Sequence, residues 1–209
     1  MMDPTPLTTF PSVAERRLLP AFVNLPRDQI HLINTAAQCR AIQEQLDTVH
    51  VFGFDTESKP TFNANEKSTG PHLLQLATDQ HAYLFQINAE TLAFLAPLLS
   101  NPKQLKVGFA LKSDVSLLRS KGIELAGTVD LSKSFHVFGI KQQVGAQNAV
   151  AILLRQYLPK SKHTKLSNWS KFPLTEAQID YACADAYASL RIYEELKRRN
   201  LLTTPRKGR

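Results

Sequence analysis

The chain has 209 residues, of which 43% are apolar and 21% are charged, a composition typical of one globular domain. At this length a single core buries about 70% of the surface that the unfolded chain exposes, so the fold requires neither disulfides nor a structural metal. Cys39 and Cys183 form no CxxC pair, which excludes a disulfide-rich scaffold and a zinc module. We find no membrane span and no secretory signal, so we expect a cytoplasmic protein without a membrane partner.

The net charge of +7 is distributed unevenly along the chain. Residues 1–130 contain 11 Lys/Arg and 13 Asp/Glu, whereas residues 131–209 contain 14 and 5. Within the second part, Leu131–Thr175 has no acidic residue at all. Such a segment attracts polyanions, although an ordinary solvated basic surface would explain the same charge. The candidates for contacts to a phosphate backbone are Lys162, Lys165 and Lys171.

The organisation of the chain is simple, with no internal repeat and no flexible linker. Residues 1–25, which include four prolines, are predicted to form an N-terminal arm. Residues 26–202 form one domain, and residues 203–209 a basic disordered tail.

The first part of the domain is rich in predicted strands, at residues 30–33, 49–57, 73–78 and 82–87. A helix capped at Thr35 separates the first two strands. The last three are close in sequence and predict an antiparallel meander.

The second part alternates helix and strand: helix 89–99, strand 105–109, helix 113–121, strand 128–131 and then mostly helix. Hairpins followed by such alternation predict an α/β fold with a mixed sheet and helices on both faces.

Asp55 and Glu57 stand at the end of the predicted strand 49–57. Side chains alternate across a sheet, so both carboxylates project from the same face and repel each other unless a cation lies between them. Lys59 is close in sequence and offers an ordinary ion pair as the simpler explanation.

A second acid, Asp114, follows the strand 105–109 at the start of a helix. This places it at the carboxyl end of the sheet, where open α/β folds bind ligands. The simpler explanation is that Ser113 or Asp114 caps the helix.

Tyr181 and Asp185 lie four residues apart on a helix that begins near Thr175, so they share one helix face. Small neighbouring residues allow this helix to pack close to the sheet and allow Asp185 to reach the strand carboxylates. A surface hydrogen bond between the two side chains is the simpler explanation.

Four carboxylates that converge on one point require divalent cations to offset their repulsion. The ligands are hard oxygens, and no His/Cys cluster accompanies them, so the expected ions are Mg²⁺ or Mn²⁺.

These segments resemble the three exonuclease motifs of the DEDD superfamily, in the tyrosine branch that includes ribonuclease D and the Werner-syndrome exonuclease domain. The motifs are Phe54–Glu57, Val107–Phe109 leading to Asp114, and Tyr181–Asp185. The resemblance extends over residues 30–200 and includes the flanking segments Pro71–Ala77, Val129–Leu131, Ser167–Ser170 and Leu174–Gln178.

The resemblance implies a ribonuclease H-like fold with a five-stranded mixed sheet and 3′→5′ hydrolysis of nucleic acid to nucleoside 5′-monophosphates by two metal ions. It implies that Asp55, Glu57 and Asp185 ligate the first ion, and that Asp55, with Asp114 through water, holds the second. Tyr181 would orient the attacking water, and Thr56 would lie near the terminal 3′-hydroxyl.

Two functions are consistent with the sequence: a metal-dependent exonuclease acting on single-stranded 3′ ends of DNA or RNA, and a nucleic-acid-binding or scaffold protein that keeps the fold without the activity. The presence of Asp55, Glu57, Asp114, Tyr181 and Asp185 together favours the enzyme. The sequence decides neither the choice between DNA and RNA nor the oligomeric state.

Overall fold

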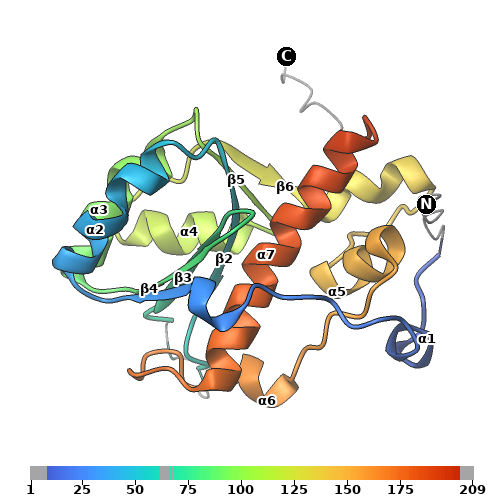
Figure 1. The fold of residues 1–209 in the computed structure, drawn as a ribbon, viewed down its shortest axis with the longest axis horizontal. Helices are drawn as coiled ribbons and strands as arrows, with labels where there is room; N and C mark the ends of the chain where they lie inside the picture. Colours follow the sequence, from blue (N-terminus) through green and yellow to red (C-terminus); the bar gives the residue numbers. More distant parts are fainter. Residues whose placement is uncertain (1–8, 62–65, 67, 203–209) are drawn as a thin grey trace.

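The computed structural model describes residues 9–61, 66 and 68–202. Its centre is a six-stranded mixed sheet within these residues, with the strand order β1-β4-β3-β2-β5-β6 (Figure 1). The strands are β1 (Ile30–Ile33), β2 (Val51–Glu57), β3 (Leu73–Ala77), β4 (Ala82–Gln86), β5 (Leu105–Gly108) and β6 (Thr128–Asp130).

The pairing of the strands confirms the predicted α/β class. Strands β2, β3 and β4 form the antiparallel meander, and β5 and β6 continue the sheet in parallel beyond β2. The expected number of five strands is wrong, because the predicted strand Ile30–Ile33 joins the sheet as its sixth member. It pairs in parallel with β4, from Ile30 opposite Ala82 to Ile33 opposite Phe85, and both isoleucines are buried.

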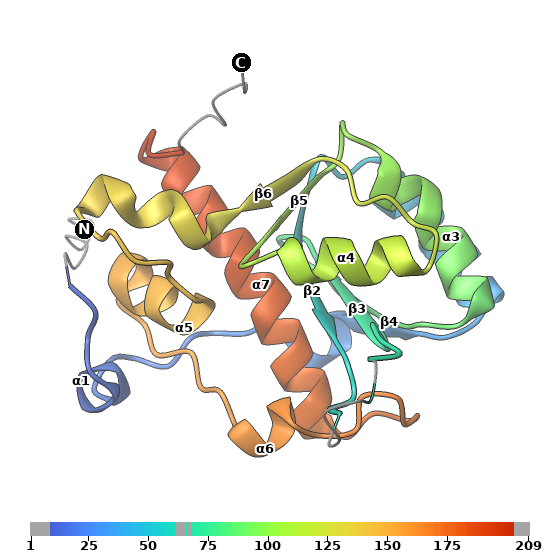
Figure 2. The same cartoon turned by 180° about the vertical axis from the view of Figure 1, so that it is seen from behind.

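One face of the sheet is covered by α2 (Ala36–Asp47), α3 (Ala89–Ser100) and α4 (Lys112–Ser120), of which α4 lies in front of the strands in Figure 2. Their apolar side chains form a core with Phe52 and Phe54 of β2. The long helix α7 (Glu176–Arg198) crosses the other face (Figure 1). The residues of β2 therefore alternate between the two faces of the sheet, with Phe52 and Phe54 in the core on one face and Gly53, Asp55 and Glu57 on the face toward α7.

The shorter helices lie beside α7 or near the chain ends. They are α1 (Val13–Arg17), the 3₁₀ helices η1 (Arg27–Gln29) and η2 (Leu131–Phe138), α5 (Ala146–Ala149), the π-helical turn η3 (Val150–Leu154) and α6 (Lys162–Lys165).

The described part of the N-terminal arm is bound to the domain. Ala21 forms a parallel β-bridge with Tyr157, Phe22 N–H donates to the Tyr157 carbonyl at 2.8 Å, and Tyr157 N–H donates to the Pro20 carbonyl at 2.8 Å. Leu25 is buried in the core beneath α7. The predicted tail, residues 203–209, lies outside the described residues. Among the helices of the described chain, none combines the length and the apolar character needed to cross a bilayer.

The contact between α7 and β2 is unusually close at Gly53. A Cβ atom at this position would lie 2.0 Å from the Ala186 carbonyl oxygen and 3.0 Å from Leu190 Cβ. The backbone of the helix therefore rests directly on the backbone of the strand, which only glycine permits. This contact sets the distance between α7 and the sheet close to the acids. Gly53 lies two residues before Asp55 on β2, and Ala186 lies one residue after Asp185 on α7.

We expect Gly53→Ala to lower the free energy of unfolding by about 2 kcal/mol, because the added methyl group forces α7 away from β2. Urea denaturation of the variant measures this loss. Gly145→Ala is the matched control, since a Cβ at Gly145 meets nothing within 4 Å. A Gly53→Ala protein as stable as the wild type would contradict the close packing.

Candidate active site

Three carboxylates meet where β2 ends beneath α7. Single oxygen atoms of Asp55, Glu57 and Asp185 all lie within 4.8 Å of one another. Asp185 is 4% exposed, whereas Asp55 and Glu57 are partly exposed. Of the four acids expected to converge, these three lie together. The simpler explanation of an Asp55 or Glu57 pair with Lys59 is not observed, because Lys59 pairs with Glu66 at 3.7 Å.

Helix α7 carries Tyr181 and Asp185 to this point on one face. Its first turn is held by a capping box in which the Thr175 hydroxyl accepts from Gln178 N–H and the Gln178 side chain accepts from Thr175 N–H. The Asp185 carboxylate lies close enough to the Tyr181 phenol for its charge to raise the pKa of that group. Tyr181 also packs against the buried ring of Trp169, with the ring centroids 5.8 Å apart.

Asp114 reaches the site from the opposite side of β2. It is 6% exposed in the first turn of α4, and one of its carboxylate oxygens accepts a hydrogen bond of 2.5 Å from the Thr56 hydroxyl. The N-cap of α4 is Leu111, which provides no side-chain cap, so neither Ser113 nor Asp114 occupies the capping position. Asp114 is outside the group of three acids whose oxygens lie within 4.8 Å.

Asp130 determines how α4 begins. Its carboxylate accepts from the N–H groups of Ala110 at 3.0 Å, Leu111 at 3.2 Å and Ser132 at 2.9 Å. Ala110 has a φ of 55°, a left-handed conformation that is unfavourable for a residue with a side chain. Asp130 thus stabilises the tight turn from β5 into α4, and it supports the position of Asp114 without joining the acidic group.

Lys160 also contacts the site, and the sequence reasoning did not single it out. Its Nζ lies 2.7 Å from Asp185 Oδ2 and 5.4 Å from the centroid of the Tyr181 ring. Its side chain is 26% exposed. The signal available in the sequence was its position among the basic residues before Tyr181, but nothing in that run distinguishes Lys160 from its neighbours.

The three predicted phosphate-binding lysines are exposed and lie before the start of α7. Lys162 and Lys165 are the first and last residues of α6, and Lys171 follows Trp169 in the loop to α7. Of the three, Lys165 is close enough for its charge to lower the pKa of both Glu57 and Asp185.

Burial and mutual repulsion raise the pKa values of the acids. Burial, followed by the charge of Asp185, raises the pKa of Glu57 to about 8. The same two causes raise the pKa of Asp55 well above its usual range. Burial and then the neighbouring carboxylates also raise the pKa of the Tyr181 phenol, so this side chain is neutral at neutral pH and its O–H serves as a hydrogen-bond donor.

The donor set suits a hard divalent cation. Asp55, Glu57 and Asp185 supply only carboxylate oxygens, and the group found among the described residues includes neither His nor Cys. Oxygen ligands of this kind favour Mg²⁺ or Mn²⁺ over Zn²⁺. A cation would also offset the repulsion that keeps these pKa values high.

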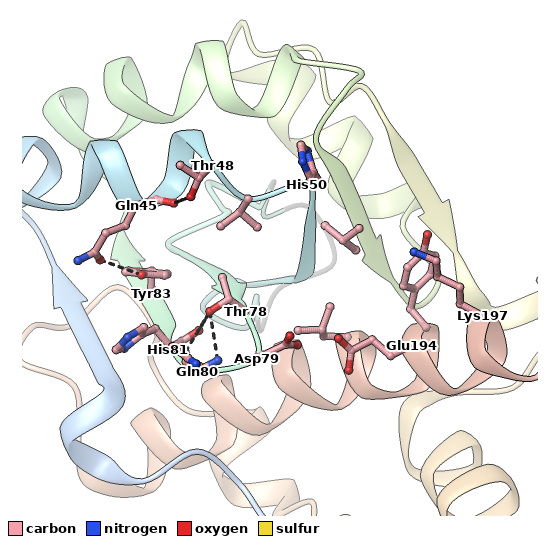
Figure 3. A pocket seen from close by; sticks show the side chains of 14 residues that line it. Gln45, Thr48, His50, Thr78, Asp79, Gln80, His81, Tyr83, Glu194 and Lys197 are labelled. Atoms are coloured by element: carbon pink, nitrogen blue, oxygen red, sulfur yellow. Dashed lines mark hydrogen bonds between the residues drawn. The ribbon is translucent and has the colours of Figure 1, made fainter.

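A separate pocket of about 630 Å³ lies near Val51, at the end of β2 away from Glu57 (Figure 3). On its walls Tyr83 donates a hydrogen bond of 3.1 Å to Gln45, and Glu194 of α7 lies close enough to Asp79 of the β3–β4 turn for that carboxylate to raise its pKa. The acids of the candidate site do not line it. Burial and then the neighbouring Asp79 raise the pKa of Glu194 to about 7.

The solved structures with similar folds show that the chain has a ribonuclease H-like fold. The structure of the Aedes aegypti Nibbler EXO domain matches with a TM-score of 0.70 and 24% identity, over 85% of this chain and 91% of that one. Escherichia coli ribonuclease D matches with a TM-score of 0.67 and 21% identity, over 83% of this chain and 46% of that one.

A family model described as 3′-5′ exonuclease matches residues 30–200. The chain belongs to this family of hydrolases. It is 31% identical over 169 residues to the mouse bifunctional 3′-5′ exonuclease/ATP-dependent helicase WRN, and 32% identical over 173 residues to ribonuclease D of Gluconacetobacter diazotrophicus. These matches cover 77% and 80% of this chain but 12% and 42% of the relatives, so the likeness concerns one part of each longer protein.

The carboxyl pair in the separate pocket gives a prediction on pH and stability. The pKa of Glu194 is raised in the folded state, so its contribution to stability is fully present below pH 4.5 and is lost as the pH rises to about 7. We expect Glu194→Gln to unfold with nearly the wild-type free energy at pH 5 and to be more stable than the wild type at pH 8, because glutamine cannot ionise.

Urea denaturation at pH 5 and pH 8 measures the free energy of unfolding of both proteins. The other acids contribute equally to both proteins, so their contributions cancel in the difference. The exposed Glu124 provides the control variant Glu124→Gln. An equal difference between Glu194→Gln and the wild type at pH 5 and pH 8 would show that Glu194 ionises as easily in the folded protein as in the unfolded chain.

Proposed function

We propose that this domain is a metal-dependent 3′–5′ exonuclease of the tyrosine branch of the DEDD superfamily, which releases nucleoside 5′-monophosphates from single-stranded 3′ ends. The observation that carries the proposal is the convergence of Asp55, Glu57 and Asp185 within 4.8 Å, with Tyr181 one helical turn before Asp185 on α7. A buried group of like charges is unfavourable unless it binds a cation.

In this proposal Asp55, Glu57 and Asp185 hold one Mg²⁺ or Mn²⁺ ion, and Asp55, with Asp114 through water, holds a second. The bound ions supply electrostatic stabilisation of the attacking and leaving oxygens of the phosphodiester. Thr56 fixes the carboxylate of Asp114 by donating to it at 2.5 Å. Its oxygen keeps lone pairs that can accept a hydrogen bond from the terminal 3′-hydroxyl.

Tyr181 orients the attacking water. Its raised pKa keeps the phenol protonated at neutral pH, which argues against a role as general base. Packing of the ring against Trp169 restricts its orientation, so the hydroxyl is held near the carboxylates.

Lys162, Lys165 and Lys171 are proposed to bind the phosphate backbone of the substrate. They are exposed in a segment that contains no acidic residue, and they lie on the part of the chain that leads into α7. One of the similar structures is titled as a Trypanosoma brucei RNase D complex with RNA U12, which supports nucleic acid as the class of substrate.

Two variants test the catalytic assignment. We expect Asp185→Asn to reduce hydrolysis of an end-labelled single strand about 1000-fold, since loss of a ligand removes several kcal/mol of stabilisation. We expect Tyr181→Phe to reduce it about 100-fold, because the water is no longer oriented. Product ladders in Mg²⁺, in Mn²⁺ and with chelator give the rates, the direction and the metal requirement.

Asp180→Asn is the matched control for this experiment, since Asp180 is an exposed acid on the same helix. It should retain the wild-type rate. Wild-type turnover by Asp185→Asn would refute the assignment. A wild-type protein that binds single strands without cleaving them in either metal would support the scaffold function instead.

The basic segment gives a prediction on salt dependence. For single strands, the logarithm of the association constant falls with the logarithm of the salt concentration, with a slope of about −0.7 per neutralised phosphate. Replacing Lys162, Lys165 and Lys171 together by Ala should therefore make the slope shallower by about 2, as measured by fluorescence anisotropy with Ca²⁺ in place of Mg²⁺. The control triple variant replaces the exposed Lys103, Lys133 and Lys141. A larger effect in the control would place the nucleic acid on another surface.

A further inference from the structure

The contact of Lys160 with the acidic group differs from an ordinary surface ion pair. The Asp185 side chain is 5% exposed and that of Lys160 26% exposed, with Nζ and Oδ2 2.7 Å apart. In the pair between Arg27 and Glu176, by comparison, the side chains are 47% and 75% exposed. An exposed pair contributes little, whereas a buried charge that loses its partner is strongly unfavourable.

The ammonium group also faces more than one acid. Its charge acts on Asp55 and Glu57 as well as on Asp185, and it lies 5.4 Å from the centre of the Tyr181 ring. Lys160 therefore supplies a positive charge to the whole group, on the side where Asp185 and Tyr181 meet.

The oxygen that Lys160 binds belongs to a proposed metal ligand. If Asp185 Oδ2 bound the ammonium and a divalent cation at once, two positive charges would lie within a few ångströms of each other and would repel. Lysine has a flexible stem, and here it is partly exposed in the loop before α6, so its ammonium can move toward solvent.

We propose that Lys160 is a resident cation of the carboxylate group, which competes with the divalent metal for Asp185 and so sets the metal concentration that the protein requires. Without metal, the ammonium offsets the repulsion among the acids and keeps them together. Metal binding displaces it. The inference rests on the proposed function, in that the competing ligand is the metal of that site.

The test is Mn²⁺ binding in the absence of nucleic acid, measured by electron paramagnetic resonance of the free ion. Lys160→Met removes the charge and keeps a stem of similar length, and we expect it to bind Mn²⁺ about tenfold more tightly, within the range of coupling between competing ligands. Lys160→Arg keeps the charge, and we expect it to bind Mn²⁺ no more tightly than the wild type does. Lys162→Met, an equal change of charge at an exposed position, should alter the affinity by less than about threefold.

Thermal unfolding separates this competition from a purely structural ion pair. In chelator, Lys160→Met should unfold at a lower temperature than the wild type, because the acids lose their counter-charge. Saturating Mn²⁺ should raise its unfolding temperature by more than it raises that of the wild type, because tighter binding gives more stabilisation. A structural role alone would leave the variant equally destabilised with and without Mn²⁺.

Unchanged or weaker Mn²⁺ binding by Lys160→Met would overturn the inference, as would an equal gain in Lys162→Met. If Lys160→Met does not fold, tighter binding by Lys160→Arg than by the wild type would overturn it as well. A gain of affinity in Lys160→Met without nuclease activity in any variant would support the inference and refute the proposed exonuclease. Absence of Mn²⁺ binding by every variant would refute both.

Discussion

The backbone contact between α7 and β2 at Gly53 is the constraint on which the site depends. A strand can bring two acids to one face of a sheet, but the third must come from another element at close range. The helix approaches so nearly that no Cβ fits between Gly53 and the Ala186 carbonyl. Asp185, one residue before this contact, is thereby brought against Asp55 and Glu57. Packing free energy thus holds together groups that electrostatics would separate.

Several features of the structure reduce the repulsion among these acids. Burial raises the pKa values of Asp55 and Glu57, and Lys160 supplies a counter-charge to Asp185. Asp114 stays apart from the other three and is held by Thr56 on the other side of β2. Each of these features reduces the unfavourable free energy of holding the acids close together.

The parts of the site that follow from local periodicity could be predicted from the sequence. Alternation along β2 places Asp55 beside Glu57, and helical spacing places Tyr181 over Asp185. The resemblance to known exonucleases then indicated that these pairs meet. The α/β fold class was predicted correctly for the same reason, since the antiparallel meander and the later alternation of helix and strand are local patterns.

Contacts that depend on loop geometry could not be predicted from local sequence patterns. The position of Lys160 is decided by the path of the chain before α6, and no local pattern distinguishes it from Lys162 or Lys165. The role of Asp130 depends on a left-handed turn at Ala110, which alanine rarely adopts. The sixth strand was recognised as a strand, but its place at the sheet edge is a matter of tertiary pairing with β4.

The β-bridge between the N-terminal arm and Tyr157 connects the arm to the loop that carries Lys160. Two main-chain hydrogen bonds join Pro20 and Phe22 to Tyr157, three positions before the lysine that contacts Asp185. A shortened protein that starts at Pro26 would lose both links and free the loop that carries the ammonium group. Residues 20–22 therefore help to position the loop beside the acidic group, and a shortened protein should keep them.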